Sequence, residues 1–213
     1  MIRIALGVCL CLPALAADSD LNRLLKNVEE RYNHAKTLQV GFNESYSVEG
    51  RSGKPESGTL SLRKPGKMRW DYSSPSGKLF ISDGKNVFYY TPANNRVEKM
   101  PLKESEDMRA PLAFLLGKLE FDRDFENFKG KPGDAGSTVI DARPRSDRLP
   151  YKEVEFVVSP GFEIRKLDVV GHDDSVLTFV FTNERLNPSI DERIFRFQMP
   201  KGAIMVEGGQ ETN

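Results

Sequence analysis

Several features that are common in catalytic or nucleic-acid-binding proteins are scarce in this chain of 213 residues. It contains two histidines, two cysteines and one tryptophan, and its 31 basic residues are matched by 31 acidic residues. A formal charge of zero provides no bulk attraction to nucleic acid or to anionic lipid. We therefore expect no nucleic-acid partner.

Both cysteines lie near the start of the chain, in a stretch with the composition of a secretory signal. A short basic start is followed by an apolar run over residues 4–12 and by a small-residue pattern that ends at Ala16. The apolar run is too short to span a membrane. We expect cleavage after Ala16, which makes residues 1–16 a signal peptide and residues 17–213 a single exported, soluble domain.

The mature chain would then contain no cysteine, and its stability would depend on its core instead of on disulfide bonds. A lipid-anchored cysteine is the competing interpretation. It is disfavoured because few apolar residues precede Cys9 and because no small-residue cleavage pattern precedes Cys11.

Motifs for catalysis and for metal binding are also missing. Neither His34 nor His172 lies in a recognisable nucleophile motif, and no Gly-x-Ser-x-Gly sequence occurs. The Asp-x-Asp-x-Glu sequence at 122–126 resembles half of a calcium loop, but Asn127 stands where that loop needs glycine. We expect no catalytic residue, no metal and no cofactor. A serine–histidine–aspartate site assembled only by the fold is the remaining enzymatic alternative.

What the chain does contain is alternation of apolar and polar residues with a period of two, clearest over residues 58–90. Proline and glycine turns at 64–66, 74–77 and 83–84 divide this stretch into short strands. One face of the strands would carry Leu60, Leu62, Lys64, Met68, Trp70 and Tyr72, continued by Leu79, Ile81, Val87 and Tyr89. The other face would carry Phe80, Phe88 and Tyr90.

The rest of the chain predicts more strands at hairpin spacing and few helices. The helical pattern covers 18–36, a short helix runs into a strand over 119–128, and a helical turn is expected at 187–192. Strands are expected at 37–48, 96–100, 137–143, 151–158, 163–170, 176–182 and 193–199. We predict a mainly β protein in which one antiparallel sheet is strongly curved or rolled into a barrel.

A second short helix, predicted at 111–117, is apolar almost all round. Proline at its first position and glycine at its end suit a helix start and a C-cap. A helix without a polar face must be buried or must contact apolar material. Packing in the core and covering a cavity are both consistent with this pattern.

Several blocks of sequence resemble the LolA family of periplasmic outer-membrane lipoprotein carrier proteins. They are Leu-x-Leu-x-Lys-Pro-Gly-Lys-Met-Arg-Trp-Asp-Tyr at 60–72, Leu-x-Ile-Ser-Asp-Gly-Lys at 79–85 and Pro-Leu-x-x-Leu-Leu-Gly at 111–117. The resemblance extends over essentially the whole mature chain. It implies a half-open β-barrel whose hydrophobic cavity is covered by a helical lid.

The same resemblance implies a function and its partners. Acylated lipoproteins would be taken from an inner-membrane ATP-binding-cassette release complex and carried through the periplasm to an outer-membrane receptor lipoprotein, where one is present. We expect a monomer without enzymatic activity. The predicted cavity residues are Leu60, Leu62, Met68, Trp70, Leu79, Ile81, Leu112, Leu115 and Leu116.

The chain departs from the family pattern at Lys64, where the best-known members have an arginine that bonds to the lid helices. Strand parity places Lys64 on the face of Leu60 and Leu62, so we assign it to lid closure. Lysine is a point donor without the planar fork of arginine, which predicts a looser closed state. The alternative functions are a carrier or sensor of another lipid or glycolipid on the same fold, and an exported lipid hydrolase.

Overall fold

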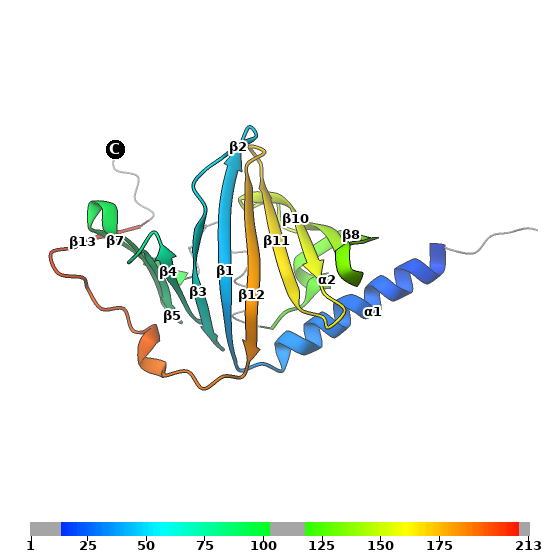
Figure 1. The fold of residues 1–213 in the computed structure, drawn as a ribbon, viewed down its shortest axis with the longest axis horizontal. Coiled ribbons are helices and arrows are strands. Elements are labelled where there is room, and N and C mark those ends of the chain that lie inside the picture. Colours follow the sequence, from blue (N-terminus) through cyan, green and yellow to red (C-terminus); the bar gives the residue numbers. More distant parts are fainter. Residues whose placement is uncertain (1–13, 103–117, 209–213) are drawn as a thin grey trace, which may run out of the picture.

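One curved sheet of 13 strands runs through residues 14–102 and 118–208, the part of the chain that the computed structural model describes (Figure 1). The strand order is β13-β7-β6-β5-β4-β3-β1-β12-β11-β10-β9-β8, with β2 paired to β1 beside this path. Neighbouring strands are antiparallel except for β13 and β7, which run parallel. The predicted curved sheet with helices is confirmed.

The strands are short and follow one another closely in sequence. They are β1 (Thr37–Val48), β2 (Arg51–Ser52), β3 (Glu56–Arg63), β4 (Lys67–Ser74), β5 (Leu79–Asp83), β6 (Asn86–Thr91), β7 (Arg96–Pro101), β8 (Phe125–Pro132), β9 (Thr138–Pro144), β10 (Tyr151–Val158), β11 (Ile164–Gly171), β12 (Val176–Leu186) and β13 (Ile204–Glu207). The helices are α1 (Ala14–Asn33), α2 (Phe121–Asp124) and the 3-10 turns η1 (Pro92–Asn94), η4 (Asp134–Gly136) and η5 (Glu192–Phe195).

Period-two alternation predicts most of these strands correctly. Strands β1 and β10 have the bounds predicted from the sequence, and the pattern over 119–128 divides into α2 and β8 as expected. Helix α1 begins four residues earlier and ends three residues earlier than the 18–36 pattern predicts. The apolar helix predicted at 111–117 lies outside the described residues.

The prediction for the C-terminal segment is wrong. Residues 193–199 do not form a strand: η5 occupies the first part, and the carboxylate of Asp191 caps it by accepting a hydrogen bond from the backbone N–H of Arg193 (2.9 Å). Apolar residues of this segment pack on the convex face of the sheet. The rings of Phe197 and Phe88, for example, stack with centroids 4.7 Å apart. The last strand is β13, in a tail that the sequence pattern left as irregular.

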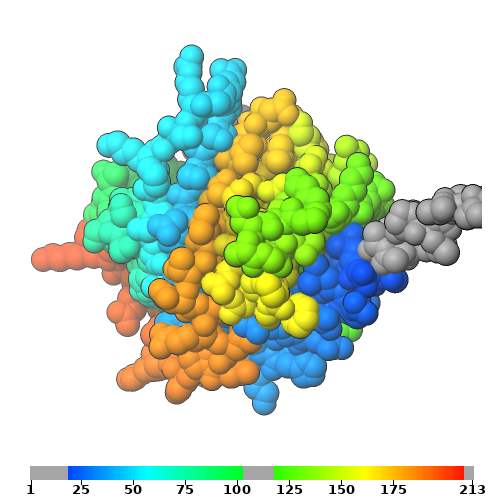
Figure 2. Space-filling view, turned by 45° about the vertical axis from the view of Figure 1, so that its right-hand side comes forward, coloured from blue at the N-terminus to red at the C-terminus, as the bar shows by residue number. Residues whose placement is uncertain are grey.

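The main hydrophobic core lies between the concave face of the sheet and the segment formed by α1 and α2. Leu25, Val28 and Tyr32 of α1 and Phe121 of α2 belong to one buried cluster with the inward residues of the strands. Figure 2 shows the blue atoms of α1 along one margin of the molecule, next to the green and yellow atoms of β8 to β11. No helix of the described residues meets the length and hydropathy that a membrane span requires.

A close approach of backbones makes one glycine essential to the sheet. A β-bulge lies between Ser57 and Gly58 where β3 pairs with β4. A Cβ atom on Gly58 would lie 2.0 Å from the backbone oxygen of Asp71. No change of side-chain rotamer can relieve this contact, because the Cβ atom and the opposing oxygen are both fixed by the backbone.

We expect Gly58→Ala to lower the free energy of unfolding by about 1–3 kcal/mol, as overpacking usually does. Denaturant unfolding followed by circular dichroism measures the change. Gly53→Ala is the matched control, because its Cβ would lie 3.5 Å from the oxygen of Tyr46, an ordinary contact. Equal stability of the two variants would contradict the prediction.

Candidate functional site

Four of the predicted cavity residues form one continuous apolar surface on the concave face. Leu60 and Leu62 of β3 pair with Trp70 and Met68 of β4, so all four side chains point the same way. Each is at most 2% exposed. The predicted shared face of these residues is confirmed, whereas their contact with a ligand stays a prediction.

Trp70 extends this surface across the curve of the sheet. Its ring meets Phe42 of β1 edge-on with centroids 4.7 Å apart, and it lies 5.4 Å from the ring of Phe179 on β12. Phe42 in turn contacts Tyr72 edge-on at 5.0 Å. The aromatic rings therefore join β4, β1 and β12 into one wall.

The predicted face is wrong for Leu79 and Ile81. Register pairs Trp70 with Phe80, so Phe80 lies on the concave face and its neighbours Leu79 and Ile81 lie on the convex face. Even-numbered residues thus stay on the concave face from β4 to β5, and the parity reverses at the β5–β6 turn, where Phe80 pairs with Tyr89. Alternation fixes the faces within one strand, but the register across a turn decides how they continue in the next.

Ile81 is nevertheless buried, in a second and smaller apolar layer on the convex face. Val97, Phe195 and Ile81 are each at most 1% exposed, although none belongs to the main core cluster. The C-terminal segment is fastened over this side of the sheet by side chains of β3 and β4. Arg69 donates to the oxygen of Ile194 at 3.0 Å.

Helix α1 is anchored to the strands by a partly buried polar cluster. The hydroxyl of Tyr32 donates to Glu184 Oε2 (2.6 Å) and accepts from the backbone N–H of Ile164 (2.9 Å). Arg31 bonds the other oxygen of Glu184 at 2.6 Å and lies 3.3 Å from Glu163. Burial raises the pKa of Tyr32 above its ordinary value and the Glu184 carboxylate raises it further, which keeps the phenol a neutral donor.

Lys64 also contacts α1, at the C-terminal end of the helix. Its Nζ atom donates a hydrogen bond to the backbone oxygen of Tyr32 at 2.8 Å. Loss of hydration lowers the pKa of Lys64 from its ordinary value. The side chain borders a small pocket of ≈ 10 Å³, enough for about one water molecule, so α1 fits closely against this end of the face.

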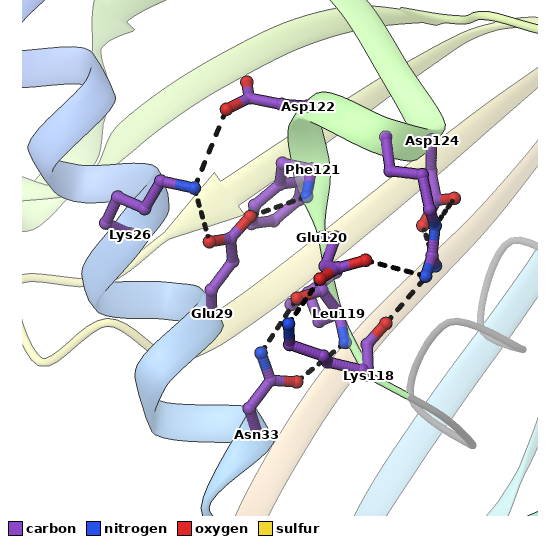
Figure 3. Close-up of polar contacts among 10 residues, drawn as sticks. Lys26, Glu29, Asn33, Lys118, Leu119, Glu120, Phe121, Asp122 and Asp124 are labelled. Carbon is purple, nitrogen blue, oxygen red and sulfur yellow. Dashed lines mark hydrogen bonds and ion pairs between the residues drawn. The ribbon is translucent and has the colours of Figure 1, made fainter.

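A third set of polar contacts joins α1 to the chain that leads into α2 (Figure 3). The Asn33 amide donates to the oxygen of Leu119 (2.8 Å) and accepts from its N–H (2.7 Å). Glu29, which is buried, accepts from the N–H of Phe121 (2.7 Å) and pairs with Lys26 at 2.9 Å. Helix α1 and residues 118–121 thus form one bonded unit over the core.

The far end of the concave face has a rim of charged and aromatic residues. Lys78 is buried, forms an ion pair with Glu56, and lies with its Nζ atom 4.3 Å from the centre of the Tyr72 ring. The hydroxyl of Tyr72 donates to Glu44 at 2.8 Å. This rim marks where the apolar wall ends.

Sequence reasoning did not find these polar contacts. Glu29 and Asn33 resemble ordinary surface residues of an amphipathic helix, and their partners lie about ninety residues away. The available signal was their spacing of four, which places both on one side of α1 beside its apolar stripe. Leu112, Leu115 and Leu116 lie outside the described residues.

The acidic sequence at 122–126 does not gather into one site. Asp122 lies 3.6 Å from Lys26, Asp124 bonds Arg123, and Glu126 pairs with Arg145 at 3.0 Å. Across residues 14–102 and 118–208, no three potential ligands come close enough to hold a metal ion.

Comparison with known proteins identifies relatives over most of the chain. A family model described as "Outer membrane lipoprotein carrier protein LolA" matches residues 33–198. Proteins named outer-membrane lipoprotein carrier protein are 28% identical in Chromobacterium violaceum, over 82% of each chain, and 26% identical in Dechloromonas aromatica, over 92% of this chain and 91% of that one. An uncharacterized conserved protein from Thermus thermophilus shares the fold, with a TM-score of 0.54 at 12% identity over 88% of this chain and 99% of that one.

We expect Asn33→Ala to loosen the unit formed by α1 and residues 118–121. Both backbone groups of Leu119 would lose their partners, which costs about 1–3 kcal/mol for each buried group left unpaired. Hydrogen exchange should accelerate at the amides of Leu119 and Phe121. Asp20→Ala, at an exposed position of the same helix, is the control and should leave these amides unchanged.

Proposed function

The chain belongs to the LolA family of outer membrane lipoprotein carrier proteins, and from this premise we propose how it carries its cargo. The acyl chains of a lipoprotein lie against the concave face and displace the unit formed by α1 and residues 118–121. The protein then moves through the periplasm as a soluble complex and delivers the lipoprotein to the outer membrane.

One observation carries this proposal: the continuous apolar wall of Leu60, Leu62, Met68 and Trp70 is buried in one cluster with residues of the separate helix α1. Each methylene exposed to water costs ~0.8 kcal/mol, so an acyl chain of about sixteen carbons costs on the order of 12 kcal/mol in water. A lipoprotein with several such chains cannot cross an aqueous space without a protein surface that replaces the membrane.

The contacts that hold α1 suit a cover that opens. A hydrogen bond contributes about 0.5–1.5 kcal/mol, and one to a charged group about 1.5–3 kcal/mol. The bonds of α1 to Lys64, Glu184 and Ile164 lie in this range, as does the ion pair of Arg31 with Glu163. When α1 leaves the wall, burial of acyl chains there can therefore offset the loss of these bonds and of the packing of α1.

The remaining parts of the proposal come from the family and from the sequence. The signal at residues 1–16 supports location in the periplasm. The partners would be acylated lipoproteins, an inner-membrane ATP-binding-cassette release complex and, where present, an outer-membrane receptor lipoprotein. Transfer needs only a graded affinity along this route, and we propose that the protein acts as a monomer and not as an enzyme. Leu112, Leu115 and Leu116 remain proposed cavity residues, whereas Leu79 and Ile81 are excluded.

Release of lipoproteins from spheroplasts tests this function. Purified mature protein is added to spheroplasts, and outer-membrane lipoproteins are measured in the supernatant. We expect release with the wild type and much less with Leu62→Glu, which places a charge on the apolar wall. Val180→Glu, at a 41% exposed position, is the matched control and should retain release. No release by the folded wild type would refute the proposal.

The donor at position 64 should set how readily the cover opens. We expect Lys64→Arg to slow uptake of a fluorescent acyl probe and to favour its release, because a guanidinium offers several donors to the backbone of α1 and stabilises the closed, empty state. Lys67→Arg is the control, since Lys67 pairs with Glu192 on the convex side. Unchanged rates in Lys64→Arg, measured by stopped-flow fluorescence, would show that this residue does not hold the cover.

A further inference from the structure

An unpaired hydrogen-bond donor lies at the centre of the apolar wall. The indole Nε1 of Trp70 is buried and has no hydrogen-bond partner. Buried polar groups are nearly always paired, so such a donor calls for an explanation. In the described part of the chain, the other buried side-chain atom of this kind is Nε of Arg63. That guanidinium already donates to the oxygen of Ile190 through another nitrogen.

Among the described residues, the neighbours of Trp70 give this donor nothing to bond. Its partners in the neighbouring strands are Leu60 and Phe80, and its ring contacts those of Phe42 and Phe179. All four side chains are apolar. A phenylalanine or leucine would line a purely hydrocarbon-binding wall without leaving a buried N–H unpaired, which is destabilising.

We propose that the indole N–H of Trp70 donates a hydrogen bond to the carbonyl oxygen of a bound acyl ester or amide. This inference rests on the proposed function and adds a specificity-determining residue to it. The apolar wall binds any long alkyl chain, and the N–H selects chains that are attached through a carbonyl. An ether-linked alkyl chain has the same length and shape but offers a weaker acceptor.

The same bond favours the loaded state over the empty one. In the structure the N–H is buried and unpaired, and a bound carbonyl would satisfy it. A ligand shifts a conformational equilibrium only through interactions that differ between the two states. The indole bond is such an interaction, because it exists only when an acyl group is present.

Calorimetric titration with dioctanoylglycerol and with its dioctyl ether tests the selectivity. We expect the wild type to bind the ester roughly threefold to tenfold more tightly than the ether, the range of one hydrogen bond. Trp70→Phe should bind both equally. Phe179→Leu is the matched control: it removes part of the same wall, lowers both affinities and keeps the preference for the ester.

The single tryptophan of the chain permits a direct measurement on the atom itself. Labelling with ¹⁵N-indole tryptophan gives one indole resonance, whose proton should move downfield when the ester binds and not when the ether binds. Incorporating benzothienylalanine in place of tryptophan changes only position 70. It keeps the ring shape, removes the N–H, and should abolish the preference without disturbing the fold.

The outcomes separate this inference from the function on which it rests. Binding of both lipids with equal affinity by the wild type, with no downfield shift specific to the ester, would overturn the role of Trp70 and leave the carrier function intact. Binding of neither lipid by the folded protein would overturn the carrier function, and the inference with it.

Discussion

The concave face of the sheet must always be covered, and the other features of this protein depend on that constraint. Its centre consists of Leu60, Leu62, Met68 and Trp70, whose exposure to water would carry a large free-energy penalty. In the structure these residues are buried in one cluster with residues of α1 and of the segment leading into α2. In the proposed loaded state acyl chains replace that helix and segment. The two states differ in what covers the wall, and the wall itself can remain the same.

A removable cover must be positioned accurately without being held too tightly, and the polar contacts of α1 meet both conditions. Tyr32 and Arg31 bond Glu184 on one side, Lys64 bonds the backbone of Tyr32 on another, and Asn33 joins the helix to Leu119. Such directional bonds fix a register that apolar packing alone would leave loose. Because each contributes only about 0.5–3 kcal/mol, a ligand that buries several acyl chains can compete with them.

The strands of residues 79–91 are apolar on both sides because their convex face is covered as well. Ile81 and Phe88 point away from the wall, and the C-terminal segment covers them through η5 and the stacked ring of Phe197. Arg69 holds that segment by bonding the backbone of Ile194. The C-terminal segment therefore covers the convex side of the sheet, whereas the cover on the concave side is the one that we propose acyl chains replace.

Local periodicity in the sequence was enough to determine most of the strands and the shared face of Leu60, Leu62, Lys64, Met68 and Trp70, because side chains in a strand alternate strictly. The resemblance to LolA added the function. Only the tertiary structure decided the face of Leu79 and Ile81, since register across a turn depends on long-range pairing. It also decided the partners of Glu29 and Asn33, the wrapping of the C-terminal segment and the unpaired N–H of Trp70. Each of these depends on contacts between residues far apart in sequence, and local alternation contains no information about them.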